Sequence, residues 1–281
     1  MKPADDGPLG SLSPAQRALL EEWLPGARVA QDHSWGQVET TVLELQSSAG
    51  RFIVKAGGPS DHHIARELRA HASWLQPWVS TGHAPRLVHG DAEAKLLLTE
   101  YLPGRLIEGT AAQDDPDTYR QAGALLARFH GQTSAHDPTW NDQLRATVLK
   151  HLDGRHRIDP EIEAMVRAEV ATWPSGGADV VPTHGDWQPR NWLIDGDVVR
   201  VIDFGRADLR PPVEDFARLM RQDFARNPEL EAAFVAGYGH DPREPALMRR
   251  ALLKEAVGTA AWAYGIGARR SSNWATGSSP A

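Results

Sequence analysis

The chain of 281 residues contains no cysteine. Disulfide frameworks and thiolate metal sites are therefore excluded, and the composition suits a reducing compartment. No basic start followed by an apolar stretch opens the chain, and no apolar run approaches the length that crosses a membrane. These absences predict a soluble, cytoplasmic protein with no membrane partner.

An excess of positive charge is also missing, because the formal net charge is −7 at pH 7. A broad nucleic-acid surface is therefore not expected, although a locally basic phosphate site can lie inside an acidic protein. The acidic balance could instead attract a cationic substrate. No internal repeat or heptad run is present. Nothing in the sequence indicates the oligomeric state, so a monomer is the default expectation.

The first part of the chain alternates short β-type segments with helical ones. Residues 1–13 are rich in Pro, Gly and Asp, which predicts a loose leader. Ser13-Pro14 then provides an N-cap followed by Pro at the first helical position. Helices are expected at residues 14–24 and 61–78, and strands at 38–45, 51–54, 87–88 and 95–101.

Helical spacing dominates after Pro103-Gly104, and a β-rich island at 183–205 interrupts it. Helices are expected at residues 117–130, 160–173, 214–226, 229–237 and 245–264. The small, polar residues 271–281 predict a disordered tail. The pattern alone predicts an α+β chain, which we divide into an N-terminal lobe, 1–102, and a C-terminal lobe, 103–281.

The most informative stretch runs from Thr183 to Leu193 and reads Thr-His-Gly-Asp-Trp-Gln-Pro-Arg-Asn-Trp-Leu. It is followed by Asp203-Phe204-Gly205, so the spacing is Asp-x4-Asn-x11-Asp-Phe-Gly. Phosphoryl transfer needs such a set: one carboxylate to take a hydroxyl proton and two oxygen ligands for magnesium. The alternative is that Asp186 and Asn191 only cap a turn, which leaves Asp203 without a role.

This segment resembles the catalytic core of the aminoglycoside phosphotransferase and choline kinase group, in which His-Gly-Asp-x4-Asn stands where protein kinases carry His-Arg-Asp. The resemblance covers roughly residues 30–265. It implies a bilobal protein-kinase-like fold, with a β-rich N-terminal lobe and a mainly helical C-terminal lobe. It further implies ATP and Mg as cofactors, Asp186 as catalytic base, and Asn191 and Asp203 as magnesium ligands.

The resemblance also implies a lysine for the α- and β-phosphates and a carboxylate that holds this lysine in place. Lys55, at the end of the expected strand 51–54, matches the lysine. Glu67, in the helix that follows, matches the carboxylate. The alternatives are a solvated strand terminus for Lys55 and an exposed Glu67 paired with Arg66 or Arg69.

Other nucleotide contacts are expected at two loops. The phosphate-covering loop should lie at 33–41, where Ser34 and Gly36 are the candidates because the protein-kinase glycine pattern is missing. The adenine site should follow the strand that contains Leu96, at Thr99 to Leu102, with Thr99 and Tyr101 as candidates. Main-chain groups read a purine edge there, so side-chain identity says little.

The acceptor pocket has the weakest sequence signal. In the last long helix, Glu255 and Trp262 lie on one stripe, which suggests a carboxylate for an amine or hydroxyl and a stacking wall. Asp208 and Glu214 are the other candidate contacts. A buried pairing of Glu255 with an arginine is equally compatible with the pattern.

Four polar residues near the motif have open roles. Arg190 and Arg206 could contact an anion or face solvent, and His184 is expected to support the loop rather than act as a base. Asp215 either braces the loop or caps a helix.

Taken together, the sequence predicts an ATP-dependent O-phosphotransferase that acts on a hydroxyl of a small molecule, with an aminoglycoside-like antibiotic as first acceptor. The alternatives are a metabolite kinase for choline-like, sugar or amino-alcohol acceptors, and a non-catalytic nucleotide-binding module. A metal-dependent hydrolase built on His184 and Asp186 would leave Lys55 and Glu67 unused.

Overall fold

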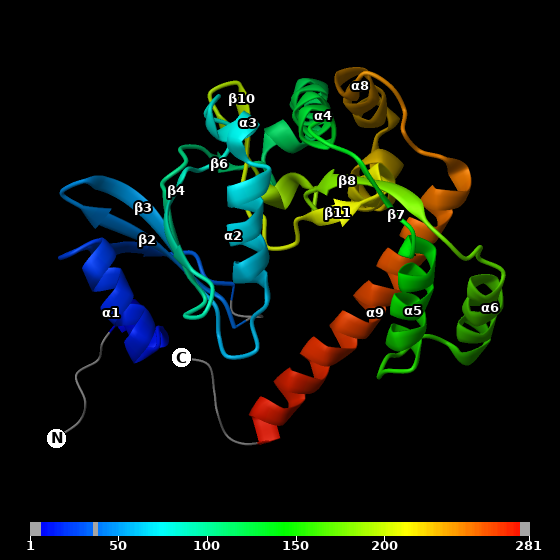
Figure 1. Ribbon diagram of the computed structural model, residues 1–281, viewed down its shortest axis with the longest axis horizontal. Coiled ribbons are helices and arrows are strands. Elements are labelled where there is room, and N and C mark those ends of the chain that lie inside the picture. The colour runs from blue at the N-terminus through cyan, green and yellow to red at the C-terminus, as the bar shows by residue number, and fades with distance from the viewer. Residues whose placement is uncertain (1–6, 36–38, 276–281) are drawn as a thin grey trace.

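Two lobes of different secondary structure make up the computed structural model, which describes residues 7–35 and 39–275 (Figure 1). The N-terminal lobe is built on an antiparallel sheet of order β1-β2-β3-β5-β4. Its strands are β1 (Arg28–Asp32), β2 (Thr41–Ser47), β3 (Gly50–Ala56), β4 (Leu87–Asp91) and β5 (Leu96–Glu100). The expected hairpin across residues 47–50 is present between β2 and β3.

Period-two alternation in β3 decides which side chains reach the site. Phe52, Val54 and Ala56 are buried in one cluster with Leu20 of helix α1 (Pro14–Trp23). Because successive side chains of a strand point to opposite faces, Lys55 lies on the other face of the sheet. That face is the one on which helix α2 (His63–Ser73) stands (Figure 1).

The segment before α1 is more ordered than its composition predicts. Residues Gly7–Ser11 form a 3-10 helix, and Leu12 is only 2% exposed in the cluster beneath the sheet. Ser13 caps α1 and forms a capping box with Gln16, as the Ser-Pro pair indicates. The hydrophobic anchor at Leu12 thus ties residues 7–13 to the lobe.

The helix expected at 61–78 is two helices, α2 and the short α3 (Gln76–Val79). Pro77 lacks the N–H that would continue the α2 hydrogen-bond ladder, so the chain turns before it. The turn buries Leu75 and Trp78, and the Trp78 indole donates to the carbonyl of Leu125 at 3.1 Å. This bond attaches α3 of the N-terminal lobe to Leu125 of the C-terminal lobe.

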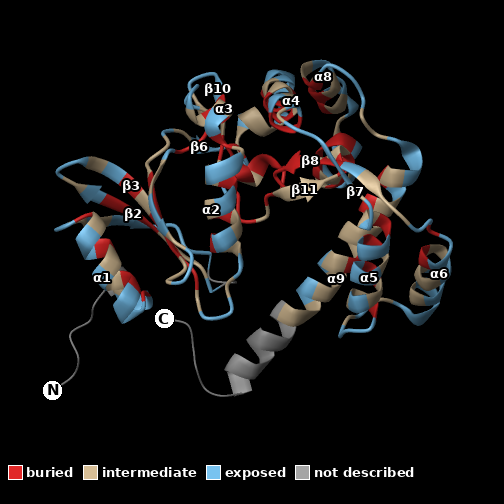
Figure 2. Cartoon of the chain, viewed as in Figure 1, coloured by how far each residue is buried: buried red, intermediate tan, exposed pale blue. Residues whose placement is uncertain are grey.

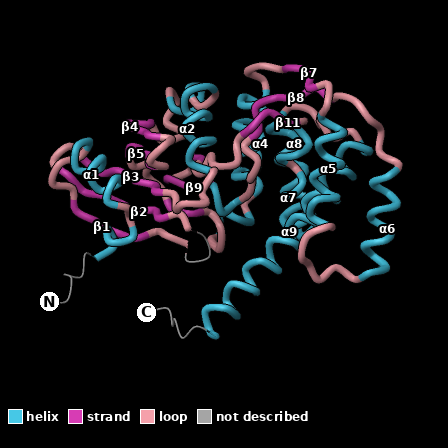
Figure 3. The backbone as a smooth tube through the Cα atoms, turned by 60° about the horizontal axis from the view of Figure 1, so that its bottom comes forward, coloured by secondary structure: helices cyan, strands magenta, loops and turns pink. Residues whose placement is uncertain are grey.

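The C-terminal lobe consists of helices and two small sheets, of order β10-β9-β6 and β11-β8-β7. Figure 3 shows the helices of this lobe beside β8 and β11. The helices are α4 (Pro116–His130), α5 (Trp140–Leu152), α6 (Pro160–Ala171), α7 (Ala217–Leu219), α8 (Pro228–Tyr238) and α9 (Pro245–Ala275). The strands are β6 (Arg105–Leu106), β7 (Ala135–Asp137), β8 (Ala178–Thr183), β9 (Trp192–Asp195), β10 (Val198–Val201) and β11 (Asp208–Arg210).

Three sequence-based expectations differ from this lobe. The helix expected at 214–226 is a 3-10 turn (Pro212–Asp215), α7 and a π-helical segment (Met220–Phe224). Helix α5 was not expected, and its hydrophobic face is weakly defined. Helix α9 continues to Ala275, into the segment whose small residues predict disorder. Within the described residues, every helix is too short or too polar to span a bilayer.

An aromatic core lies directly behind the catalytic motif. The ring of Trp78 stacks on Phe129, with ring centroids 4.3 Å apart, and on Trp187, with centroids 5.7 Å apart. The ring centroid of Phe204 lies 6.0 Å from that of Trp78. Trp187 and Phe204 belong to the two halves of the motif, so burying them fixes both halves to the lobe. Buried residues accordingly gather around β8 and the loops beside it (Figure 2).

Close approach of α4 and α8 generates a stability prediction. A Cβ at Gly237 would lie 1.9 Å from the Arg120 carbonyl oxygen, which is main chain and cannot move aside cheaply. We expect Gly237→Ala to lower the free energy of unfolding by about 1–3 kcal/mol through overpacking. Urea denaturation followed by circular dichroism measures this.

Gly258→Ala on α9 is the matched control, because its nearest neighbouring atom would lie 3.8 Å away. An alanine in an open helix position should raise stability by about 0.5–1 kcal/mol. If the free energy of unfolding changed in the same direction in both variants, the close approach of α4 and α8 would not be what makes Gly237 necessary.

Candidate active site

The catalytic motif forms a loop, residues 184–191, between β8 and β9. Gly185 has φ +77, and a Cβ at this position would lie 2.3 Å from the Arg206 carbonyl oxygen. Only glycine combines that conformation with that approach. The glycine therefore sets the chain direction from which Asp186 projects.

Asp215 braces the start of this loop from beneath. Its carboxylate accepts the main-chain N–H groups of His184 at 2.8 Å and Gly185 at 2.6 Å. His130 bonds the same carboxylate at 3.0 Å and Tyr238 at 2.8 Å on its other nitrogen. Burial alone would raise the pKa of Asp215, but its contacts with His130, His184 and the N–H of Gly185 together outweigh burial and lower that pKa. The brace therefore stays anionic.

His184 lies behind the loop rather than on its open side. Burial lowers its pKa, so the ring is neutral. Nε2 donates to the carbonyl of Ile202 at 3.1 Å, and Nδ1 accepts the N–H of Asp186 at 3.3 Å. One ring nitrogen thus ties the loop to Ile202, and the other holds the main chain of Asp186 within the loop.

Asp186 is buried at the centre of the site with both carboxylate oxygens paired. Oδ2 lies 2.8 Å from Arg190, and Oδ1 lies 2.7 Å from Arg218 and also accepts from Gln188. Burial would raise the pKa of Asp186, but the guanidinium groups of Arg218 and Arg190 outweigh it and hold the pKa below its ordinary value. The carboxylate is therefore ionised, as a proton acceptor must be.

Asn191 and Asp203 fit a magnesium ion by their chemistry. The Asn191 amide donates to the main-chain oxygen of Asp186 at 2.7 Å, which leaves its Oδ1 available. Asp203 has φ +68, a strained conformation for a residue with a side chain, and its side chain is 50% exposed. Among the described residues no group of three or more His, Asp or Glu could hold a metal. A magnesium ion here would share its ligands with nucleotide phosphates.

Lys55 joins the N-terminal lobe to this centre. Its Nζ lies 2.9 and 3.0 Å from the two Glu67 oxygens and 3.1 Å from Asp203 Oδ1. Burial would lower the pKa of Lys55, but the carboxylates of Asp203 and Glu67 outweigh it and raise the pKa. In turn the ammonium lowers the pKa of Asp203 to about 2. The structure thus brings together the lysine, the helix carboxylate and the Asp-Phe-Gly carboxylate.

The other expected nucleotide residues are placed less decisively. Ser34 follows β1 and uses its hydroxyl to accept the Val42 N–H at 3.0 Å, whereas Gly36 lies outside the described residues. Thr99 is buried in β5, and Tyr101 lies under the guanidinium of Arg51 at 3.6 Å. Beyond them, the main-chain N–H of Leu102 donates to no described group. A free amide at this link is what a purine edge requires.

Of the expected acceptor contacts, two carboxylates pair away from Asp186. Asp208 pairs with Arg69 at 2.9 Å, and Glu214 pairs with Lys254. Glu255 lies 2.9 Å from Arg218 and so connects to Asp186 through it. Glu255 therefore pairs with an arginine, which is the alternative that the sequence left open for this residue.

Trp262 is 45% exposed and stacks on Trp35 with ring centroids 6.0 Å apart. Trp35 in turn lies 5.7 Å from the Arg190 guanidinium. The two tryptophans come from the loop after β1 and from α9, so this wall connects the two lobes. Neither Trp35 nor Arg218 carries a sequence signal, because each reaches the site only through contacts with segments far away in the chain.

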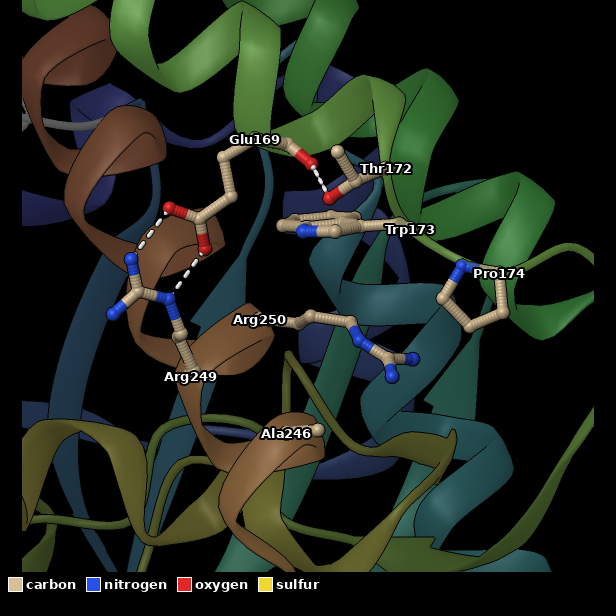
Figure 4. A pocket seen from close by; sticks show the side chains of 7 residues that line it. All are labelled: Glu169, Thr172, Trp173, Pro174, Ala246, Arg249 and Arg250. Carbon is tan, nitrogen blue, oxygen red and sulfur yellow. Dashed lines mark hydrogen bonds and ion pairs between the residues drawn. The ribbon is translucent and has the colours of Figure 1, made fainter.

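A separate pocket of about 400 Å³ lies between the end of α6 and the start of α9 (Figure 4). Its arginines already have partners: Arg249 pairs with Glu169 at 2.6 Å, and Arg250 donates to Asn141 at 2.9 Å. None of the expected site residues lines it. The polar groups that suit phosphoryl transfer converge at Asp186 instead.

Solved structures show where this fold recurs. An aminoglycoside-3'-phosphotransferase of type VIII matches with a TM-score of 0.60 at 22% identity, over 86% of this chain and 98% of that chain. A choline kinase from Streptococcus pneumoniae matches with a TM-score of 0.61 at 15% identity, over 94% and 99%. A macrolide 2'-phosphotransferase from Brachybacterium faecium matches with 0.57 at 16% identity, over 90% and 92%.

At these identities the structural matches show the fold alone, and they confirm the expected kinase-like α+β fold. No curated protein matches the chain in sequence. The model of the phosphotransferase enzyme family matches residues 30–251. That range contains the motif loop, Lys55 and Asp203, and it covers most of the 281 residues. The chain therefore belongs to the phosphotransferase enzyme family.

Proposed function

We propose that the protein is an ATP- and magnesium-dependent O-phosphotransferase that acts on a hydroxyl group of a small molecule. The observation that carries this proposal is the position of Lys55, whose ammonium bridges Glu67 and Asp203 within 3.1 Å. A cation fixed in this way can bind the α- and β-phosphates beside two magnesium-type ligands. A non-catalytic nucleotide-binding module would not require Asp186 as well.

The residues divide the reaction between them. Asp186 accepts the proton of the acceptor hydroxyl while the hydroxyl oxygen bonds to the γ-phosphorus. The bond from that phosphorus to the β–γ bridging oxygen breaks, and ADP leaves with the electron pair. Lys55 holds the phosphates of the nucleotide. Magnesium, held by Asn191 and Asp203, would supply charge neutralisation on the phosphate oxygens.

Nucleotide contacts are assigned to the N-terminal lobe, residues 1–102, and the acceptor to the lobe from 103 onward. Ser34 and Gly36 belong to the phosphate-covering loop, and Thr99 and Tyr101 flank the adenine link. ATP is a cytoplasmic substrate, so we place the enzyme in the cytoplasm. For the oligomeric state we keep the monomer as the default.

For the acceptor we propose an antibiotic, with a metabolite as the alternative. Aminoglycoside and macrolide phosphotransferases among the solved structures support the first. A choline kinase of equal structural similarity supports the second. A screen of hydroxylated antibiotics and metabolites that measures ADP release tests the reaction itself.

Asp186→Asn tests the base while keeping the side-chain shape beside Arg190 and Arg218. We expect turnover to fall by about 100- to 10,000-fold because the amide cannot accept the proton, whereas calorimetry should still detect ATP. Asp179→Asn, at a carboxylate 86% exposed, is the control that should retain activity. Turnover near wild type in Asp186→Asn would remove the assigned base.

Asp203→Asn tests the metal ligand. A site loses affinity for a hard cation such as magnesium when a charged ligand oxygen is replaced by a neutral one. We therefore expect calorimetry to show a larger loss of nucleotide affinity with magnesium than without it. Equal losses under both conditions would assign Asp203 a structural role.

Lys55→Ala and Glu67→Gln test the ion pair as a unit. Because both act through one contact, the double variant should lose clearly less activity, in free energy, than the two single losses combined. The pair Arg249 and Glu169, at 2.6 Å and away from the site, is the matched control cycle and should show no coupling in kcat/KM. Additive effects at Lys55 and Glu67 would show that they act independently.

A further inference from the structure

The short helix α7 places an arginine on the carboxylate that is assigned as the base. Nη1 of Arg218 lies 2.7 Å from Oδ1 of Asp186, and the two side chains are 17% and 4% exposed. Arg218 lies outside both the loop 184–191 and the Asp-Phe-Gly segment. A contact this short between two largely buried charges restricts the direction in which the carboxylate points.

The backbone that carries Arg218 is held on both sides. Its neighbours Ala217 and Leu219 are buried, at 3% and 0% exposure. The preceding 3-10 turn contains Asp215, which accepts two main-chain N–H groups at the start of the catalytic loop. This stretch of chain therefore holds the catalytic loop twice, at its start through Asp215 and at the carboxylate of Asp186 through Arg218.

Helix α9 holds the other side of the guanidinium group. Nε of Arg218 lies 2.9 Å from Oε1 of Glu255, whose side chain is 22% exposed. Glu255 stands on a fixed part of α9, because Ala251 and Val257 are buried in two core clusters. An arginine side chain loses considerable rotamer freedom when it is ordered. The second carboxylate therefore favours the rotamer in which Arg218 reaches Asp186.

The ion pair leaves an oxygen of Asp186 accessible to a hydroxyl group. Oδ1, which Arg218 contacts, also accepts from Gln188. Oδ2 accepts from Arg190 at 2.8 Å and from no other described residue. Each carboxylate oxygen has two lone pairs, so Oδ2 can accept a hydroxyl proton while Arg218 stays on Oδ1. The arginine thus orients the carboxylate without blocking it.

We propose that Arg218 is a positioning residue for phosphoryl transfer: its guanidinium group orients the carboxylate of Asp186, and Glu255 holds the guanidinium group in place. The inference rests on the proposed phosphotransferase function and adds two residues from outside the motif to it. It also assigns Glu255 to Arg218 rather than to the acceptor. A base must be aligned with the attacking hydroxyl, and a misplacement of about 1 Å can cost about 100-fold in rate.

Two other roles of Arg218 have to be distinguished from this one. In the first, Arg218 only joins α7 to α9, so that its loss lowers stability and leaves kcat of the folded protein intact. In the second, its guanidinium group contacts the transferred phosphate, so that its loss lowers the rate whether or not Asp186 is present. A positioning role differs from both, because it acts on kcat and only through Asp186.

The kinetics of Arg218→Gln test the role. Coupled ADP release with kanamycin, erythromycin and choline as acceptors gives kcat and KM. Circular dichroism and calorimetry with ATP and magnesium establish that the variant is folded and binds the nucleotide. We expect kcat to fall by about 10- to 100-fold because the base is no longer aligned. The Kd of ATP should stay close to that of the wild type.

Two milder variants extend the test. Arg218→Lys keeps the charge but loses the planar fork that spans both carboxylates, so it should recover part of the lost kcat. Glu255→Gln should lower kcat less than Arg218→Gln does. The variant with both Gln substitutions should match Arg218→Gln alone, because Glu255 acts through the arginine. If Arg218→Gln does not fold, Arg218→Lys and Glu255→Gln must still lower kcat at unchanged ATP affinity.

Arg249→Gln is the matched control. Arg249 stands on α9, as Glu255 does, and its ion pair with Glu169, at 2.6 Å, lies away from the site. The substitution removes an arginine–carboxylate pair of the same helix and should leave kcat unchanged.

The comparison that decides between the roles is made in the Asp186→Asn background. There Arg218→Gln should have little further effect on the residual rate, because the group that it positions is already lost. Equal losses in both backgrounds would assign Arg218 to the phosphate and overturn the inference, as would wild-type kcat in Arg218→Gln. A wild-type protein that releases no ADP with any acceptor would be the separate failure of the proposed function and would remove this inference with it.

Discussion

The contact on which the site depends is the ammonium of Lys55 between two carboxylates. It joins β3 to α2 through Glu67 and reaches the C-terminal lobe through Asp203. A buried ammonium is costly unless it is paired, so the two lobes hold their relative position around this charge. The strained backbone of Asp203 and the N–H of Leu102, which has no acceptor among the described residues, are both accounted for by the proposed nucleotide between the lobes.

The loop 184–191 is held by a carboxylate on its inner side and by two arginines on its outer side. Asp215 and His130 fix its start from inside the lobe, and Arg218 with Arg190 fix the carboxylate of Asp186 from outside. The loop is thereby held before any substrate binds, which lowers the reorganisation needed during transfer.

Local patterns in the sequence were sufficient for much of this site. The spacing of Asp186, Asn191 and Asp203 indicated the chemistry, and the β-type residues 51–54 placed Lys55 at the end of a strand. Ser13-Pro14 marked the start of α1 because capping is a local interaction. The kinase-like α+β fold is confirmed, whereas the roles of the site residues remain predictions.

Features formed by distant segments could not be predicted in the same way. The contacts of Arg218 with Asp186 and of Trp35 with Trp262 arise from packing between segments far apart in the chain. Burial of Leu12 likewise orders residues whose composition predicts a loose leader. The break before α3 depends on the burial of Leu75 and Trp78 as well as on Pro77.

Phosphorus NMR of the wild-type protein with ATP, magnesium and a hydroxylated acceptor tests the central claim most directly. The account predicts that the γ-phosphate signal is replaced by that of a phosphate monoester on the acceptor, in step with formation of ADP. Release of inorganic phosphate alone, or an unchanged spectrum when both substrates are bound, would contradict it.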